Sequence, residues 1–221
     1  MITKPILNAD EAIRAVTDGM IVLVPGFLAC GTPETLIDAL IAAGTKDLTA
    51  VCNDSAYPDR GIGKLIRARR LRRFITTHQG TNSDMKNRAT SSDDGGIQVE
   101  LVPQGTLIER LRSGGAGLGG VLTPTGIGTP VENGKQKIAV NGRDYLLELP
   151  LRGDVALIRA ETADRAGNLI YRHTARNYNP VMATAADRVI AEVARVVELG
   201  ELDPDRVETP GIYVDVLVLR P

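Results

Sequence analysis

The sequence predicts an α/β fold: an open, mostly parallel, doubly wound sheet flanked by helices, with a small β-hairpin near residues 137–148. The 221 residues include 23 Gly but only five Tyr, two Phe and no Trp, as is common where parallel strands end in tight loops. The first 52 residues alternate helix, strand, loop, helix and strand, which is how a doubly wound sheet begins. Asn141-Gly142 supplies the hairpin turn.

The N-terminal elements are the most clearly marked. Asn8 and Glu11 form a capping pair at the start of the first helix. A continuous apolar run then predicts a strand buried on both faces, and Pro33 and Gly44 bound the second helix. In chain order, we expect a helix at 9–17, a strand at 20–24, a loop at 25–32, a helix at 33–43 and a strand at 48–52.

The remaining elements alternate less regularly. Further helices are expected at 62–69, 104–113 and 179–186, and further strands at 73–77, 99–102, 154–160, 169–172, 188–193 and 212–219. The polar residues 80–96 are expected to form a mobile loop. No repeat or linker interrupts the pattern, so residues 1–221 are expected to form a single domain.

Charge and hydropathy exclude two classes of protein. Lys and Arg total 26 against 27 Asp and Glu, so the basic excess typical of a nucleic-acid-binding protein is missing. The basic run at 64–73 is interpreted as an exposed helix face, with a phosphate contact as the alternative. The longest apolar run, at 20–30, is interrupted by Pro25 and is too short to span a bilayer. We therefore expect neither a nucleic-acid nor a membrane partner.

The cysteines and histidines predict no disulfide framework and no metal site. Cys30 and Cys52 belong to no Cys-x-x-Cys pair, and His78 and His173 have no ligand neighbours at metal spacing. Cys30 is either a thiolate stabilised ahead of a helix or a small buried hydrophobe. With no apolar signal core at the N-terminus, the expected compartment is the reducing cytoplasm.

A glycine-rich segment, Gly115-Ala-Gly-Leu-Gly-Gly120, matches the spacing of a dinucleotide fingerprint. That motif needs a strand before it and a helix after it, whereas here a helix precedes it and residues 121–126 cannot begin one. We therefore expect no nicotinamide or flavin cofactor. Instead, Gly115, Gly117, Gly119 and Gly120 are expected to shape a cleft or an interface.

The loop at 25–32 is the strongest candidate site. It follows a buried strand and precedes a helix, which is where open α/β sheets bind ligands. Free backbone N–H groups of Gly26, Phe27 and Gly31 could face an oxyanion or a thioester carbonyl. The structural alternative is a tight strand–helix connection.

Residues 18–33, Asp-Gly-Met-Ile-Val-Leu-Val-Pro-Gly-Phe-Leu-Ala-Cys-Gly-Thr-Pro, resemble the alpha-subunit signature of the family I coenzyme A transferases. Only Pro25 departs from it, since it replaces the first Gly of Gly-Gly-Phe. The resemblance is closest to acetate/butyrate–acetoacetate CoA-transferases, and a succinyl-CoA:3-oxoacid type is also compatible. It continues through residues 53–64, 103–110, 114–126 and 175–180.

The resemblance implies a hetero-oligomeric enzyme that moves CoA between a short-chain acyl-CoA and a free carboxylic acid. A glutamate of the beta subunit would form an acyl anhydride and then a glutamyl–CoA thioester in a ping-pong reaction. This chain would contribute Gly26, Phe27 and Gly31 to oxyanion or acyl-CoA binding. It would place the 115–120 loop at the cleft or interface. CoA would be a substrate, and no cofactor is implied.

Glu132 stands in a sequence, Val131-Glu132-Asn133-Gly134, that resembles the beta subunit's nucleophile motif. The preceding Ser of that motif is missing, and Lys135 begins a polar run where apolar residues should follow. We interpret Glu132 as a loop residue, so no catalytic residue is expected on this chain.

Two other functions fit the predicted fold. One is an acyl-CoA or sugar-phosphate sensor domain without transferase activity, because a fold does not determine a function. The other is a stand-alone sugar-phosphate isomerase, for which Glu109 and Asp54 would be the candidate bases.

Overall fold

The computed structural model describes residues 3–85 and 96–221. The loop predicted at 80–96 falls largely on residues 86–95, which lie outside the described part of the chain. Within that part, no helix is long and apolar enough to cross a membrane.

Within the described residues, the main sheet contains nine strands, and every pair of neighbours is parallel except the pair of β9 with β10. Its order is β1-β12-β11-β9-β2-β3-β4-β5, with β10 paired to β9. The strands are β1 (Ile6–Leu7), β2 (Ile21–Leu23), β3 (Leu48–Val51), β4 (Leu71–Thr76), β5 (Gln98–Leu101), β9 (Gly153–Asp164), β10 (Leu169–Ile170), β11 (Ala186–Val197) and β12 (Val216–Leu219). The predicted open, mostly parallel, doubly wound sheet is confirmed.

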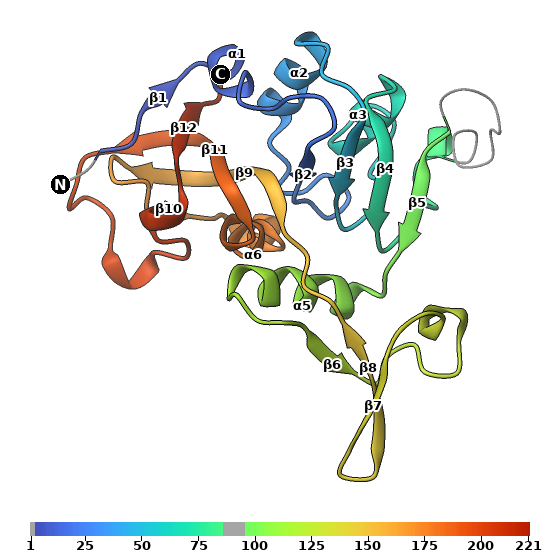
Figure 1. The fold of residues 1–221 in the computed structure, drawn as a ribbon. Helices are drawn as coiled ribbons and strands as arrows, with labels where there is room; N and C mark the ends of the chain where they lie inside the picture. Colours follow the sequence, from blue (N-terminus) through green and yellow to red (C-terminus); the bar gives the residue numbers. More distant parts are fainter. Residues whose placement is uncertain (1–2, 86–95) are drawn as a thin grey trace.

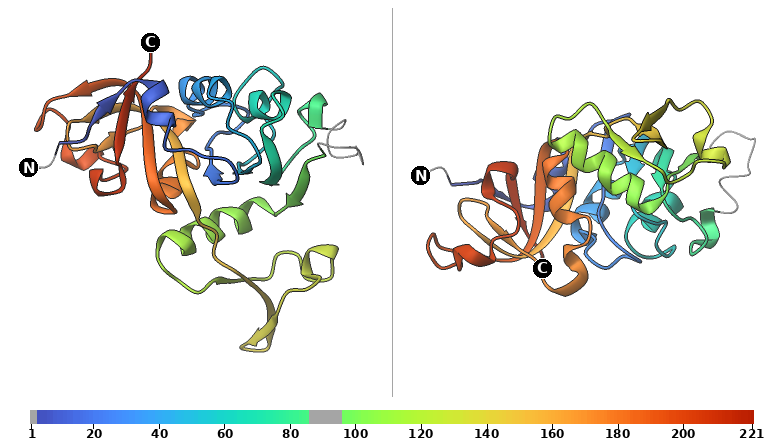
Figure 2. Two further views of the ribbon diagram at one scale, coloured as in Figure 1. Left: turned by 45° about the horizontal axis from the view of Figure 1, so that its top comes forward. Right: turned by 90° about the horizontal axis from the view of Figure 1, so that it is seen from below.

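Helices cover both faces of this sheet (Figures 1 and 2). Those with both ends inside the described residues include α1 (Ala9–Ile13), α2 (Glu34–Ala42), α3 (Ile62–Arg67), α5 (Gln104–Gly115) and α6 (Asn179–Thr184). On one face, α1, α2 and α3 pack over strand residues such as Val22 and Phe74. On the other, α5 and α6 pack over residues such as Leu23 and Ile75. Successive residues of β2 are thus buried on opposite faces, as expected from its continuous apolar run.

Several element boundaries differ from the predictions. The first helix ends at Ile13, because the bonds of Arg14, Ala15 and Val16 are i→i−3 turns; its Asn8–Glu11 capping box is present. The last strand begins at Val216 because residues 211–213 form a 3₁₀ turn. β9 and β11 have 12 residues each, longer than predicted because they pair with each other almost throughout.

A second sheet projects from the main sheet beyond α5 (Figure 1). We call residues 118–149 the arm. Its antiparallel strands are β6 (Val121–Thr123), β8 (Arg143–Glu148) and β7 (Lys137–Val140), in that order. β7 and β8 confirm the predicted hairpin, and its turn residues Asn141 and Gly142 have φ of 51° and 75°, as a type I′ turn requires. β6 was not predicted.

The two faces of the arm differ in how they are covered. Leu146 and Glu148 are buried on one face, beneath the loop that carries Lys135. The strand register places the apolar side chains of the other face together, and we call this set the open face: Leu122, Ile138, Val140, Tyr145 and Leu147. Leu122 and Val140 are each 40% exposed.

Candidate functional site

The loop after β2 closes into a tight turn. The Phe27 N–H donates to the Cys30 carbonyl at 3.1 Å, and the Cys30 N–H donates back to Phe27 at 2.9 Å. The two residues between them, Leu28 and Ala29, have φ of 49° and 68°. Residues that carry a side chain rarely adopt this left-handed backbone conformation, because it costs about 1–2 kcal/mol per residue. The surrounding structure must therefore hold the turn in place.

Asp54 holds one side of the turn from the loop after β3. The side chain is 3% exposed. Its Oδ2 accepts from the Leu28 N–H at 3.0 Å and from Asn53 Nδ2 at 2.8 Å, and its Oδ1 accepts from the Ala56 N–H at 2.8 Å. One buried carboxylate thus joins the β2 and β3 loops. Asp54 is a positioning residue here, and the catalytic-base alternative gains no support from a carboxylate whose two oxygens already accept three bonds.

The segment before α6 holds the opposite side of the turn. Asn177 Nδ2 donates to the Cys30 carbonyl at 2.9 Å, and Asn179 Nδ2 donates to the Gly31 carbonyl at 3.0 Å. Cys30 Sγ lies 3.3 Å from Thr174 Oγ1. Cys30 is exposed, so its interpretation as a buried hydrophobe is wrong, whereas Cys52 is buried. Burial raises the pKa of the Cys52 thiol to about 12, which leaves it protonated at neutral pH.

Gly26 and Gly31 are required by close approaches within the turn. A Cβ on Gly26 would lie 2.1 Å from Thr32 Oγ1, and one on Gly31 would lie 2.7 Å from the Ala175 carbonyl. Their φ values of 139° and 82° also disfavour a side chain. The Thr32 hydroxyl donates to the Pro25 carbonyl at 3.0 Å. Pro25, which departs from the family pattern, thus contributes its backbone carbonyl, and any other amino acid would supply the same acceptor.

The backbone donors differ from the expectation in one respect. The Phe27 N–H is not free, because it donates to Cys30 within the turn. In the described part of the chain, the N–H groups of Gly26 and Gly31 donate no backbone hydrogen bond. The roles of Gly26, Phe27 and Gly31 in binding an acyl group stay predictions.

A cavity of about 390 Å³ lies beside the turn at the carboxyl ends of β2, β3 and β4. Phe27 and Leu28 form its apolar wall, and half of Phe27 is exposed. Its floor is polar: Asn53 Oδ1 accepts from Gln104 Nε2 at 2.7 Å. The other lining residues are Asp54, Thr77, His78 and Thr81. An apolar wall over a hydrogen-bonded floor suits a small amphipathic group.

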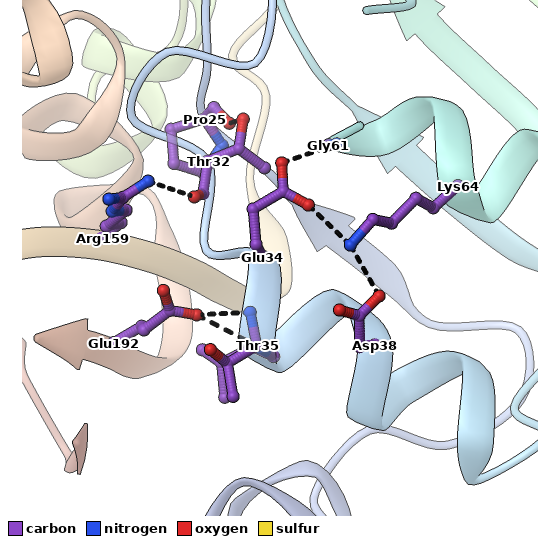
Figure 3. A network of polar contacts seen from close by, with 10 residues as sticks. Pro25, Thr32, Glu34, Thr35, Asp38, Gly61, Lys64, Arg159 and Glu192 are labelled. Atoms are coloured by element: carbon purple, nitrogen blue, oxygen red, sulfur yellow. Dashed lines mark hydrogen bonds and ion pairs between the residues drawn. The ribbon is translucent and has the colours of Figure 1, made fainter. Parts of the chain in front are cut away.

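Ion pairs fix helix α2, which carries the chain away from the turn (Figure 3). Glu34 accepts from the Gly61 N–H at 2.8 Å and pairs with Lys64 Nζ at 2.8 Å, and Lys64 also pairs with Asp38 at 2.7 Å. The two acceptors raise the pKa of Lys64 despite the opposing effect of burial. The turn is therefore attached to a helix that is itself held on two sides.

Glu192 of β11 caps the start of α2, where the N-cap residue Pro33 offers no side-chain bond. Glu192 Oε2 accepts from the Thr35 N–H at 2.8 Å (Figure 3) and from the Leu36 N–H at 3.2 Å. Burial raises the pKa of this carboxyl, against the opposing effects of the two N–H groups and Arg159.

This raised pKa predicts a pH-dependent effect of Glu192→Gln. The native state keeps the Glu192 proton to higher pH than the unfolded chain, so stability from this group is complete below the unfolded value of 4.5 and is lost as the pH rises through the native pKa. Gln keeps an acceptor for the two N–H groups but cannot ionise. The variant should therefore gain stability relative to the native chain as the pH rises above 4.5. Urea unfolding at stepped pH measures this.

The matched control is Glu198→Gln. It also removes a carboxylate, but Glu198 is exposed and does not cap a helix. Its difference from the native chain should change little with pH. A Glu192→Gln variant that becomes less stable than the native chain as the pH rises would contradict the assignment.

The glycine-rich loop joins α5 to the arm. A Cβ on Gly115 would lie 2.4 Å from Thr184 Oγ1, and one on Gly120 would lie 2.6 Å from the Glu148 carbonyl. Gly117 and Gly119 face open space. A helix precedes the loop and a strand follows it, the reverse of the order that a dinucleotide site needs. The contribution of these glycines to a cleft or interface stays a prediction.

Glu132 and Glu109 are both engaged locally. Glu132 lies in a 3₁₀ turn of the arm, where its Oε2 accepts from the Gly128 N–H at 2.7 Å and lies 3.4 Å from Lys137 Nζ. The Gly128 bond lowers the pKa of Glu132, with a smaller contribution from Lys137. Glu109 pairs with Arg112 on α5 at 3.1 Å.

The basic residues at 64–73 make more ion pairs and hydrogen bonds than the side chains of an exposed helix face would make. It extends from α3 into β4. Besides Lys64, Arg67 pairs with Asp84 at 3.0 Å, Arg70 donates to two carbonyls, and Arg73 pairs with Glu100 at 2.5 Å.

Residues 3–85 and 96–221 contain no group of three His, Cys, Asp or Glu side chains arranged as a metal site would require.

Comparisons with known proteins give consistent results. The sequence model of the family described as Coenzyme A transferase matches residues 6–220. The acetate CoA-transferase subunit alpha of Escherichia coli K12 is 49% identical over 214 residues, covering 97% of this chain and 96% of that protein. The acetoacetyl-CoA:acetate/butyrate CoA transferase alpha subunit of Clostridium acetobutylicum is 48% identical over 204 residues, or 92% of each chain.

A solved structure shows the same fold. An acyl-CoA transferase of Escherichia coli O157:H7, crystallised as a thioester complex with CoA, superposes with a TM-score of 0.85 at 24% identity. The match covers 99% of this chain and 48% of that one. This chain therefore spans about half the length of that protein.

Proposed function

Because this chain belongs to the coenzyme A transferase family, we infer that it is the alpha subunit of a hetero-oligomeric enzyme that works with a beta subunit. Its substrates are a short-chain acyl-CoA and a free carboxylic acid, of the acetoacetate, acetate or butyrate type. The observation that carries this proposal is the similarity to named alpha subunits over nearly the full length of both chains.

The proposed reaction exchanges one leaving group for another without a cofactor. A carboxylate oxygen of the beta subunit's glutamate attacks the thioester carbonyl carbon, and the CoA thiolate leaves to give a mixed anhydride. The thiolate then attacks the glutamyl carbonyl carbon and expels the first carboxylate. The incoming acid takes CoA by the reverse steps, so no proton or electron is gained or lost overall.

In this scheme, the chain stabilises the negative charge that develops on the carbonyl oxygen. The turn after β2 is the proposed source of donors, since the N–H groups of Gly26 and Gly31 donate no backbone hydrogen bond within the described residues. One well-aimed donor of this kind lowers a barrier by about 2.7–4 kcal/mol. Phe27 and Leu28 would pack against the acyl group or the pantetheine arm, because they form the apolar wall of the adjoining cavity.

We place the beta subunit against the open face of the arm. A three-stranded sheet with five apolar side chains on one face, none of them fully buried, resembles half of a protein core, as obligate interfaces do. The 115–120 loop connects this face to α5, which fits its proposed place beside the cleft.

We also propose that residues 1–221 act as one domain, in the cytoplasm, where both free cysteines stay reduced.

Reconstitution tests the function. The full chain is co-expressed with its beta subunit, and acetyl-CoA formation from acetoacetyl-CoA and acetate is measured for the complex and for each chain alone. Only the complex should be active. Glu132→Gln should retain activity to within about twofold, as a surface substitution does. Transfer by the isolated chain that Glu132→Gln abolishes would overturn the proposal and move the nucleophile onto this subunit.

Pro25→Gly tests the one departure from the family pattern. Glycine keeps the carbonyl that accepts from Thr32, so activity should be unchanged or higher. The added freedom of the unfolded chain should cost about 0.4–1 kcal/mol of stability. Steady-state kinetics of the complex and urea unfolding of the subunit measure the two effects. A tenfold loss of kcat/KM with folding intact would show that the proline itself is needed.

A further inference from the structure

A second cavity, of about 330 Å³, lies on the Cys30 side of the turn. Cys30, Gly31 and residues 172–175 line its sides, and β9 residues 159–161 line its base. The register ends β2 opposite Ala156, so β9 continues beyond the end of its neighbour and leaves this space open. We call it the switch-point cavity.

The name follows from the topology. From β2 the chain crosses through α2 to β3, and from β9 it crosses through α6 to β11 on the other face of the sheet. β2 and β9 are neighbours, so successive connections diverge between them. In open α/β sheets, the crevice at the carboxyl ends of such a strand pair is where ligands bind.

The side chains that line the cavity are strongly cationic for a protein whose net charge is −1. Arg159, Arg172 and Arg220 face it together with a single carboxylate, Glu161, giving a local charge of 3 − 1 = +2. Arg220 lies 3.4 Å from Glu161. Within residues 3–85 and 96–221, no carboxylate oxygen lies within 4.0 Å of Arg159 or Arg172. Neither guanidinium group therefore has a carboxylate at ion-pair distance, and Arg159 interacts with Glu192 only from farther away.

The cavity also holds hydrogen-bond donors, one of which is fixed in position. Arg159 donates to the Thr32 carbonyl at 3.3 Å (Figure 3), which holds its guanidinium group in position. Thr174 and His173 line the opposite wall. The neighbouring Glu192 does not line the cavity, because it is buried and its Oε2 is bound to the start of α2.

We propose that the switch-point cavity binds the phosphate group of a small phosphorylated molecule. A local charge of +2 matches a phosphate dianion, whereas a carboxylate would leave one positive charge unpaired. Arginine forks suit tetrahedral oxyanions because they donate two parallel hydrogen bonds. The cavity is larger than a phosphate alone, so it also has space for the group that carries it. This site is separate from the cavity beside Phe27, and it does not depend on the transferase function.

Direct binding to the full chain tests the proposal, with inorganic phosphate as the probe in isothermal titration calorimetry. Arg172→Gln removes an exposed guanidinium group that has no ion pair, so folding should be unaffected. It should weaken phosphate binding roughly 10- to 100-fold, as expected for a hydrogen bond to a charged group. Arg172→Lys, which keeps the charge but not the fork, should give an intermediate affinity.

Arg188→Gln is the matched control, because Arg188 is exposed at the opposite end of β11 and does not line the cavity. Its affinity for phosphate should equal that of the native chain. Three results would each overturn the proposal: no phosphate binding by the native chain, equal binding by Arg172→Gln and the native chain, or tighter binding of acetate than of phosphate.

Competition identifies the source of the phosphate. If it belongs to CoA, inorganic phosphate and adenosine 3′,5′-bisphosphate should displace CoA from the native complex, and Arg172→Gln should weaken CoA binding. If it belongs to a separate metabolite, CoA binding should be unaffected while phosphate still binds to the subunit. Both results support a phosphate site. Failure of the transferase assay alone would leave these binding measurements intact.

Discussion

Asp54→Asn should reduce the kcat/KM of the assembled transferase by about 100-fold, because a small misplacement of a reacting group has effects of this size. The carboxylate accepts from three N–H donors through its two oxygens. An asparagine NH₂ group must face the donors on one side, so either Ala56 or the Leu28 and Asn53 pair loses its acceptor. Each buried donor left unsatisfied costs about 1–3 kcal/mol, and the strained Leu28–Ala29 turn should relax.

Rescue separates positioning from a general loss of stability. A glycine at position 28 adopts the observed φ of 49° without strain, so the double variant Asp54→Asn/Leu28→Gly should recover part of the lost kcat. Asp59→Asn, which changes an exposed carboxylate in the same loop, is the control and should behave as the native chain. Full activity of Asp54→Asn, or a loss of stability without any change in kcat, would contradict the positioning role.

The second large effect is expected at the open face of the arm. The double variant Leu122→Asp/Val140→Asp should abolish co-purification of the beta subunit and, with it, CoA transfer. Replacing an apolar side chain at the centre of an interface costs at least about 2 kcal/mol, or about 30-fold in the dissociation constant. The hairpin itself should tolerate the change, because an Asp at 140 would pair with Arg143 directly across the strand.

Ala139→Lys is the matched control on the opposite face. Its new charge would lie across from Asp144 in the same hairpin, just as an Asp at 140 would lie across from Arg143. The control should assemble and turn over normally, and both variants should keep the thermal stability of the isolated subunit. Normal assembly of Leu122→Asp/Val140→Asp would exclude the open face from the interface.

The sequence predicted the features whose signal is local. The apolar run of β2, the Asn8–Glu11 capping box and the Asn141-Gly142 hairpin each need only a few neighbouring residues, and all three are present. β1 and β6 were missed because each contains only a pair of apolar residues, Ile6-Leu7 and Val121-Leu122, whereas β2 lies in the longer apolar run at 20–24. Their positions depend on pairing with strands from distant parts of the chain.

The candidate site was predicted only in part for the same reason. The loop after β2 was recognised from its place in the strand–helix pattern, but the bond that closes Phe27 on Cys30 has no sequence signature. Asp54 lies 26 residues from Leu28, and Glu192 lies 157 residues from Thr35. One signal pointed to Asp54: a carboxylate directly after a buried parallel strand lies at the edge where ligands bind. Nothing comparable marks Glu192.

The position of β9 between β2 and β11 affects the order in which the protein folds. The side chain of Asp154, at the start of β9, accepts from the Ile21 N–H across 133 residues of sequence. During synthesis, β2 to β5 can pair with one another long before β9 leaves the ribosome. Until then, β2 has an unpaired apolar edge, which is the kind of edge that draws other chains into aggregation. A subunit arranged in this way acquires its central strand late, so its yield should depend on the rate of translation through residues 24–153.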